Sequence, residues 1–376
     1  MENPFKGVLK FSSLMGKKDG SVVGIDIGSS FAKVVQLKKK GGRAILETYG
    51  ELALGPYAGL RLGQMTNLPS EKIAEALADI LKESNVTTKN AALSIPFSAS
   101  LVSIIELPKV SESQLAAIIP IEARKYIPVP IAEVSLDWWA IPASDEYETA
   151  GEGAATTADG KGKTVQIMLA AIHNDAVAKY RDVAKQNALE NPFFEIEIFS
   201  TIRSSFGRDM KLVMVLDMGA GKTKLSVVEY GVVRASHVID RGSQDITVAL
   251  SKSLGISFDQ AEALKREKGL TGGAGAENAA ETVRLSTDYL LAEVNRVLLN
   301  YEKKHNATIG KVILTGGGVL LKGFKEEAAR TLQAEVAFGD PFAKVEAPAF
   351  LDQLLQEAGP EFAVAIGLAL KKLQDL

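Results

Sequence analysis

One short pattern, an apolar run followed by an aspartate and a glycine-rich turn, occurs twice in the chain. The first copy is GIDIGSSFAK at residues 24–33, and the second is LDMGAGKTK at residues 216–224. Apolar and β-branched residues flank each turn, which is typical of a hairpin of two strands. The chain of 376 residues has room for two domains. Two related hairpins so far apart therefore predict two related halves, whose facing turns can hold one phosphate chain from both sides.

The two turns share residue types that suit phosphate and a hydrated metal ion. An aspartate ends each first strand, glycine permits close backbone approach, and a lysine lies on the next strand. Such a set suits anionic oxygens together with hydrated Mg²⁺. The aligned pairs are Asp26 with Asp217, Gly28 with Gly219, Ser30 with Gly221 and Lys33 with Lys224, while Ser29 and Thr223 add hydroxyl groups.

A third glycine turn lies in ILTGGGVLLKGF, residues 313–324, where a predicted strand leads into Gly316, Gly317 and Gly318 and then into a helix. Backbone without side chains can lie against a base or a phosphate, and a helix N-terminus favours anions. The GKT of the second turn resembles the end of a P-loop. However, the first glycine of that pattern would fall on Leu216, and a strand is expected after the lysine, so a P-loop is disfavoured.

Composition excludes several classes of protein. The chain has no cysteine, so disulfides and thiolate metal sites are excluded, and its three histidines are far apart. The net charge of -3 gives no case for nucleic-acid binding. No apolar run reaches the roughly 18 residues of a membrane span. A chain that is 46% hydrophobic and 24% charged is typical of a globular protein.

Periodicity predicts alternating strands and helices, and hence an α/β fold. Ser70 and Ser111 are the expected N-caps of two helices, and Pro120 should bend or break the second. The adjacent Trp138 and Trp139 should point to opposite faces of a strand. The expected strands are 22–27, 32–38, 44–54, 90–95, 101–107, 133–141, 164–172, 193–199, 211–217 and 311–314. The expected helices are 70–84, 111–126, 175–187, 245–254, 259–268 and 276–306.

Two segments are expected to lie outside the packed body. Residues 142–163 contain few large apolar side chains and much Gly, Ala, Thr and Asp, which predicts a mobile surface loop. The N-terminal segment, residues 1–20, mixes apolar residues with four lysines. It is interpreted as a loose tail or a helix packed on its own domain, with a basic amphipathic helix on lipid or a partner as the alternative.

These motifs, together with AVAIGLAL at residues 363–370, resemble the phosphate-1, phosphate-2, adenosine and second connecting segments of the actin, Hsp70 and sugar-kinase superfamily. The resemblance covers nearly the whole chain. Within the superfamily, residues 105–138 resemble the type IV pilus assembly family PilM, a relative of the division protein FtsA. The family-like residues there are Glu122, Ala123, Tyr126, Ile127, Pro128 and Asp137. The segments RGSQDIT, residues 241–247, and QAEALK, residues 260–265, are also similar to the family.

The resemblance implies an actin-like, ribonuclease H-like fold with two domains and four subdomains. Residues 1–20 would be an N-terminal tail. The implied subdomains are 1A at 21–95 plus 341–376, 1C at 96–190 with the mobile loop 142–163, 2A at 191–240 plus 307–340, and 2B at 241–306.

The resemblance also implies that ATP lies between the halves, with Mg²⁺ held through water by Asp26 and Asp217. Glu262 and Lys265 would flank the ribose and base, although from spacing alone they could be a surface ion pair. The implied nucleotide-binding residues are Asp26, Gly28, Ser29, Ser30, Lys33, Asp217, Gly219, Gly221, Thr223, Gly242, Glu262, Lys265, Gly316, Gly317 and Gly318.

The function implied is an ATP-binding cytoplasmic scaffold at the inner face of the inner membrane, in a type IV pilus assembly platform. Its partners would be the N-terminal cytoplasmic peptide of the membrane protein PilN and other platform proteins. A type II secretion platform is an alternative. A small-molecule kinase is disfavoured because residues 94–103 contain no acid to act as a base, which also predicts at most slow ATP hydrolysis. An FtsA-like filament protein is disfavoured because that relative is expected to end in a linker and a membrane-binding amphipathic helix, whereas this sequence ends at Leu376, directly after the C-terminal helix that the resemblance implies for subdomain 1A.

Overall fold

The computed structural model describes residues 20–141, 164–207, 211–272 and 277–376. The expected mobile loop 142–163 and all but the last residue of the expected N-terminal tail lie outside the described residues. None of the helices in the described ranges is long and apolar enough to cross a membrane.

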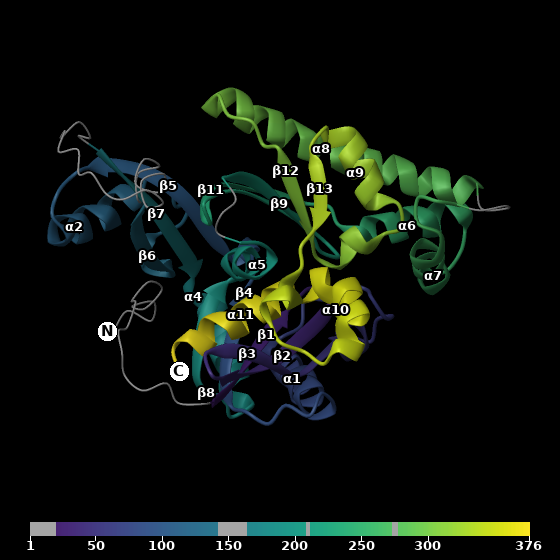
Figure 1. The fold of residues 1–376 in the computed structure, drawn as a ribbon, viewed down its shortest axis with the longest axis horizontal. Coiled ribbons are helices and arrows are strands. Elements are labelled where there is room, and N and C mark those ends of the chain that lie inside the picture. The colour runs from purple at the N-terminus through teal and green to yellow at the C-terminus, as the bar shows by residue number, and fades with distance from the viewer. Residues whose placement is uncertain (1–19, 142–163, 208–210, 273–276) are drawn as a thin grey trace.

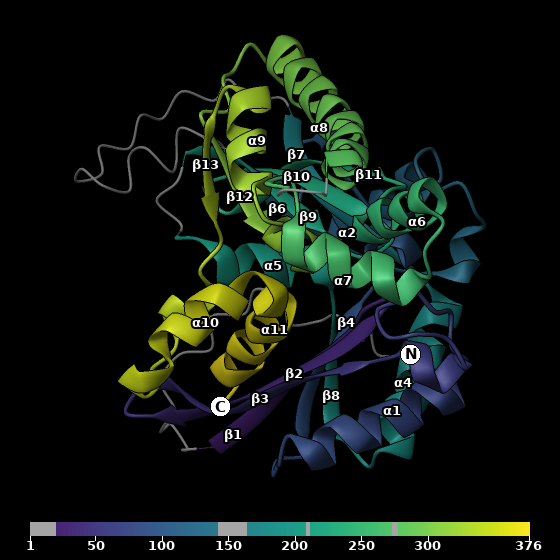
Figure 2. The same ribbon diagram turned by 90° about the vertical axis from the view of Figure 1, so that its right-hand side faces the viewer.

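Two five-stranded sheets of equivalent topology form the two halves of the protein (Figures 1 and 2). In each sheet a three-stranded antiparallel meander is extended by two parallel strands. The first sheet has the order β3-β2-β1-β4-β8, with β1 Gly20–Ile27, β2 Phe31–Lys40, β3 Arg43–Ala53, β4 Asn90–Ile95 and β8 Glu190–Ile196. The second has the order β11-β10-β9-β12-β13, with β9 Leu212–Met218, β10 Thr223–Glu229, β11 Val232–Ile239, β12 Lys311–Thr315 and β13 Glu335–Phe338. The predicted duplication is confirmed.

Helices cover both faces of each five-stranded sheet. Apolar side chains point to both faces of the strands, so both faces must be buried. In the first half, α1 (Ser70–Glu83) and α4 (Asn174–Gln186) pack on the face that carries Val23 and Ile25. The opposite face, which carries Val22, packs against α11 (Ala363–Gln374). Four short helical segments lead into α11, namely η5 (Pro341–Lys344), η6 (Ala349–Leu351), α10 (Asp352–Ala358) and η7 (Gly359–Phe362).

In the second half, one face of the sheet packs on α6, α8 and α9, with bounds Ser243–Leu254, Glu277–His305 and Phe324–Leu332. The short helix α7 (Phe258–Lys268) packs beside α6. Helix α5 (Glu197–Ser205) packs on the other face, and it also contacts α11. Consequently α5 and α11 lie between the two sheets (Figure 2).

A small third sheet is inserted between β4 and α4. It has the order β5-β7-β6, with bounds Ser100–Pro108, Thr164–His173 and Val134–Ile141, and α2 (Glu112–Ala123) packs on it. Trp139 makes an edge contact with Phe199 at 5.4 Å between ring centroids, whereas Trp138 packs in the cluster under α2. The two indoles therefore lie on opposite faces, as predicted.

Of the local predictions, the N-cap at Ser70 and the end of the second helix were wrong, and the N-cap at Ser111 was confirmed. Ser70 is not an N-cap, because Pro69 takes that position with extended backbone and Ser70 begins the helix itself. Ser111 does cap α2, in a capping box with Gln114. The helix continues past Pro120 without a break and ends at Ala123, three residues earlier than expected.

The expected strand at 193–199 was wrong in its second half. The run EIEIF alternates in polarity and so fits a strand, but Ile198 and Ile202 also fit one face of a helix, and both pack in the core from α5. Burial between the two sheets therefore decides for the helix. Strand β8 pairs with β4 in the first sheet, so residues 191–196 are better placed with subdomain 1A than with 2A, although the subdomain division as a whole stays a proposal.

Candidate functional site

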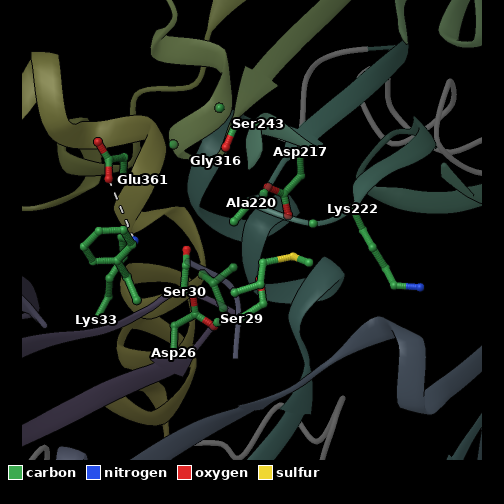
Figure 3. Close-up of a pocket in the computed structure, with 18 of the residues that line it drawn as sticks. Asp26, Ser29, Ser30, Lys33, Asp217, Ala220, Lys222, Ser243, Gly316 and Glu361 are labelled. Atoms are coloured by element: carbon green, nitrogen blue, oxygen red, sulfur yellow. Dashed lines mark ion pairs between the residues drawn. The ribbon is translucent and has the colours of Figure 1, made fainter. Parts of the chain in front are cut away.

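A cavity of about 1010 Å³ lies between the two halves, where both glycine turns meet (Figure 3). The sequence-predicted residues that line it are Asp26, Gly28, Ser29, Ser30, Lys33, Asp217, Gly219, Gly221, Glu262, Lys265, Gly316, Gly317 and Gly318. Thirteen positions scattered over almost the whole chain are thus brought to one cavity.

Thr223 and Gly242 are not among the lining residues. Thr223 is fully buried, and its hydroxyl donates to the carbonyl of Arg241 at 2.9 Å. Gly242 lies behind the second turn, where a Cβ would come within 2.5 Å of the carbonyl oxygen of Ala220. Both residues therefore support the turn from outside the cavity.

The two turns are closed by equivalent hydrogen bonds. The N–H of Gly28 donates to the carbonyl of Phe31, and the N–H of Gly219 donates to that of Lys222, both at 2.9 Å. Register pairs Asp26 with Lys33 in one hairpin and Asp217 with Lys224 in the other. Each half thus presents an aspartate, a turn and a lysine in the same arrangement.

Asp26 is a partly buried carboxyl without an ion-pair partner within salt-bridge distance among the described residues. The hydroxyl of Ser94 donates to its Oδ1 at 2.8 Å. Burial, with repulsion from Glu197, raises the pKa of Asp26 from 3.8 to about 6, although Ser94 and two lysines oppose the shift. In the absence of a ligand this carboxyl therefore titrates close to neutral pH.

The two related lysines have unequal surroundings. Lys224 Nζ lies 2.8 Å from Asp217 Oδ2 and 2.6 Å from Glu197 Oε2. Lys33 Nζ lies farther from its carboxylates, at 3.4 Å from Glu51 and 3.8 Å from Glu361 (Figure 3). Lys224 is therefore held in close ion pairs, whereas the ion pairs of Lys33 are longer.

The opposite side of the cavity carries a compact charged group on α6 and α7. Lys265 Nζ lies 2.7 Å from Glu262 Oε2, which also accepts from the hydroxyl of Thr247 at 2.6 Å. Burial raises the pKa of Glu262, but Lys265, Thr247 and Arg266 outweigh it and hold the pKa below its ordinary value. This pair lines the cavity, so the alternative of a solvated surface pair is wrong.

Residues 59–66, which we call the strap, cross from the first half to the second at the edge of the cavity. The N–H of Met65 donates to Gln244 Oε1 at 2.6 Å, and Arg61 Nε lies 3.5 Å from Asp259 Oδ2. The sulfur of Met65 lies against Gly221, where a Cβ would come within 1.9 Å of it. The absence of a side chain at Gly221 thus leaves the space that the Met65 side chain occupies against the second turn.

Comparison with known proteins identifies the family to which this architecture belongs. The family model described as type IV pilus assembly protein PilM matches residues 24–373. The chain belongs to the PilM family. It is therefore an actin-like protein of type IV pilus assembly.

Solved structures agree with the family. A chain of a "PilM-PilN type IV pilus biogenesis complex" is 26% identical, with a TM-score of 0.78 over 94% of this chain and 98% of that one. Ethanolamine utilization protein EutJ from Carboxydothermus hydrogenoformans is 16% identical, with a TM-score of 0.54 over 93% of this chain and 89% of that one. MreB5 of Spiroplasma citri, solved with ADP, is 11% identical with a TM-score of 0.51, over 94% of this chain and 97% of that one. The last two show the actin-like fold alone.

Among curated sequences, division proteins FtsA are similar. FtsA of Neisseria meningitidis is 24% identical over 84% of this chain and 82% of its own length. FtsA of Helicobacter pylori is 28% identical over 43% of this chain, and the match spans only 37% of the FtsA sequence. The expected relation of this PilM-family protein to FtsA is thereby confirmed.

Sequence reasoning missed two acidic residues of the cavity in this PilM-family chain. Glu197 was hidden because its segment resembles a strand, yet it lines the cavity as the first residue of α5. Glu361 precedes α11 and reaches the cavity only because that helix returns from the end of the chain. Residues 94–103 do lack an acid, as the sequence shows, but Glu197, which directly follows β8, brings a carboxylate to the cavity from a segment not considered there.

Proposed function

We propose that the protein is an ATP-binding scaffold of the type IV pilus inner-membrane platform, at the cytoplasmic face, and that it binds the N-terminal peptide of PilN. The observation that carries this proposal is the cavity between two equivalent turns in a chain of the PilM family. The similarity to a chain of a PilM–PilN complex supports the choice of partner. Nucleotide would bias closure of the halves and thereby partner contacts.

The lining residues suit a nucleoside triphosphate. The turns at Gly28 and Gly219 would face the phosphates, with Lys33 as a movable cation. Glu262 and Lys265 would flank the ribose and base, and the turn at Gly317 would face the nucleoside. Bound Mg²⁺ would neutralise part of the phosphate charge.

The cavity suits a metal ion bound through water molecules better than one coordinated directly by side chains. No group of three His, Cys, Asp or Glu side chains in the described ranges is arranged to hold a metal ion. Asp26 is the carboxylate best placed to orient metal-bound water, because Asp217 is already paired with Lys224. We therefore assign the larger share of the Mg²⁺ contact to Asp26.

Slow hydrolysis fits the arrangement around Glu197. Its Oε1 accepts the N–H of Phe97 at 2.7 Å, and its Oε2 accepts from Lys224. A carboxylate engaged on both oxygens is poorly placed to take a proton from water. The site thus favours binding over turnover, as a scaffold requires.

Replacing Gly317 by valine tests the nucleotide site. Gly316 and Gly318 are packed against Met218, but the atoms nearest to a Cβ on Gly317 belong to the Glu361 side chain, at 3.3 Å or more. The valine should therefore fill part of the cavity without breaking the fold, and we expect ATP affinity to fall by at least about tenfold in a calorimetric titration. Gly310→Val is the matched control, since nothing lies within 4 Å of a Cβ there. Equal ATP affinity in the two folded variants would contradict the assignment.

The partner is tested by titrating the protein with the N-terminal peptide of PilN, with and without Mg-ATP. We expect binding in both conditions and a change in affinity with nucleotide, since the halves close around it. Gly317→Val should bind the peptide but lose the effect of ATP. Absence of peptide binding in either condition, while ATP still binds, would remove the pilus-scaffold proposal and leave the nucleotide site.

A further inference from the structure

We propose that the protein pairs with a second copy of itself through the outer face of α8, with the two helices antiparallel and related by a two-fold axis at Ala292. The proposal goes beyond the nucleotide cavity, because the described residues that line the cavity include none of α8. In Figures 1 and 2, α8 lies along the outer edge of the second half, on the side away from the first sheet. Its outer face is therefore open to a partner.

A stripe of exposed residues runs along this outer face. Leu285, Tyr289 and Leu299 are 65%, 54% and 53% exposed, respectively, although each has a large hydrophobic side chain. Ala292 is also exposed and lies between the last two. Successive spacings of four, three and seven residues place all four on one side of a helix. We call these four residues the outer stripe.

The opposite side of α8 supplies its packing in the second half. Val283, Leu290, Val294 and Leu298 lie in the core cluster beneath the helix. The outer stripe is therefore not needed for that core. Single exposed apolar residues are ordinary on a protein surface, but an aligned run over about four helical turns is typical of a seam between two helices.

The outer stripe fits a second copy of α8 that runs in the opposite direction. When Ala292 faces Ala292 across a two-fold axis, a residue before it faces the residue equally far after it in the other copy. Leu285 and Leu299 lie seven positions before and after Ala292, so they face each other in two equivalent pairs. The small side chain of Ala292 lets the two helix axes approach closely at the centre.

Charged residues beside the outer stripe are complementary in the same register. Asp288 and Arg296 lie four positions before and after Ala292, and Glu281 and Lys303 lie eleven positions before and after it. All four charged residues are exposed. Each carboxylate thus faces a cation of the partner subunit. A parallel pair would instead bring each of these charges to its own equivalent, so repulsion disfavours that direction.

Arg296 and Tyr289 are suited to meet across this interface. Arg296 pairs with Glu293 of its own helix at 2.7 Å, but a guanidinium has five N–H donors and can also bind a carboxylate of the partner subunit. The Arg241 guanidinium lies 4.7 Å from the centroid of the Tyr289 ring. That contact holds the ring in place from within the same chain, and it leaves the ring 54% exposed for a partner.

The size of the paired segment indicates how strong the association is. From Glu281 to Lys303 the helix extends over about 33 Å. Stable interfaces bury about 800 Å² on each partner, and a single pair of helices of this length reaches at most about that area. We therefore expect a reversible dimer whose population rises with protein concentration. The apolar pairs supply most of the affinity, because exposed ion pairs contribute little, and the charges select the direction.

Cysteine cross-linking tests the register. The chain has no cysteine, so a single introduced thiol reports a single contact. Ala292→Cys places two thiols at the two-fold axis, within disulfide reach, and we expect it to form a covalent dimer under mild oxidation. Lys304→Cys is the matched control, exposed on the same helix but turned about 120° away from Ala292. Cross-linking that is no faster for Ala292→Cys than for the control would overturn the proposed register.

Charge reversal, measured by sedimentation equilibrium, tests the pairing of Asp288 with Arg296. Asp288→Lys and Arg296→Glu should each weaken dimerisation by at least about tenfold, because each brings like charges together. The double variant restores opposite charges in reverse order, so its dissociation constant should return to within about threefold of the wild-type value. Lys304→Glu, a charge reversal outside the interface, should leave dimerisation unchanged.

The outcomes separate this proposal from the proposed function. A wild type that stays monomeric at the highest concentration at which it remains soluble would overturn the dimer. Dimerisation that is unaffected by Asp288→Lys would overturn the assignment to α8. ATP titration of each variant checks its fold, and the affinity should equal that of the wild type, because the changed residues do not line the cavity. Failure of the dimer would therefore leave the nucleotide site and the PilN proposal intact.

Discussion

Replacing Gly367 by alanine is expected to destabilise the protein by about 3 kcal/mol or more, near the upper end of the range for overpacked cores. Gly367 lies in α11 where this helix crosses α5, and a Cβ there would come within 1.9 Å of the carbonyl oxygen of Ser200. No side-chain movement relieves a clash with backbone, so the two helices must move apart. These helices lie between the two sheets, so the shift would spread to both halves.

The sign of the stability change in Gly367→Ala distinguishes helix packing from helix propensity. Helix propensity alone predicts that alanine at a helical glycine stabilises by about 1 kcal/mol. The packing argument predicts the opposite sign, and urea unfolding measures it directly. Gly310→Ala, at an open position, should change stability little. A Gly367→Ala protein as stable as the wild type would mean that α5 and α11 are not in the contact described.

The second large effect is expected for Asp26→Asn, which should act in opposite directions on stability and on binding. The pKa of Asp26 rises from 3.8 to about 6 on folding, so its deprotonation opposes the folded state. The shift corresponds to about 3 kcal/mol. Asparagine, which carries no charge, should therefore stabilise the nucleotide-free protein by up to about this amount above pH 7, while Mg-ATP affinity falls.

The pH dependence identifies the cause. Because folding raises the pKa of Asp26, the folded wild type is stabilised while Asp26 is protonated. This contribution to the free energy of unfolding is lost as pH rises from about 4 to about 6. The stability gap between Asp26→Asn and the wild type should thus open over this interval and stay constant above it. Urea unfolding at several pH values measures the gap. Asp240→Asn is the control of opposite sign, because Lys222 holds the pKa of the exposed Asp240 below its ordinary value, so the charged form stabilises the fold there. A gap independent of pH would show that burial of the Asp26 charge is not the cause.

Local patterns predicted the hairpins and the glycine turns because each signal lies within a few consecutive residues. Asp26 to Lys33 and Asp217 to Lys224 are such segments, and their pairing follows from strand register. The resemblance to the family then supplied the cleft, which no local pattern shows. Helix α5 was not predicted because its sequence fits both the two-residue period of a strand and the 3.6-residue period of a helix. Only the packing of this segment between the two sheets decides that the helix forms.

Charge relations within the cavity depend on contacts between distant segments. Lys33 meets Glu361 only because α11 returns across the first sheet, and Lys224 meets Glu197 only because α5 enters between the halves. Neither pair has a spacing that a periodicity argument can use. The residues predicted from motifs are thus the ones that form the turns, whereas those found only in the fold are the ones that set the charge.

The strap bears on the timing of nucleotide exchange. Its contacts from Met65 to Gln244 and from Arg61 to Asp259 join the halves at the edge of the cavity, so we expect a nucleotide bound there to leave more readily when they break. The residence time should then follow how often the cleft opens, as well as how strongly the phosphates are held. Because the ion pair of Arg61 is exposed and screened by salt, ionic strength should act on the release rate. A scaffold of this kind would keep its nucleotide through many brief encounters with a partner.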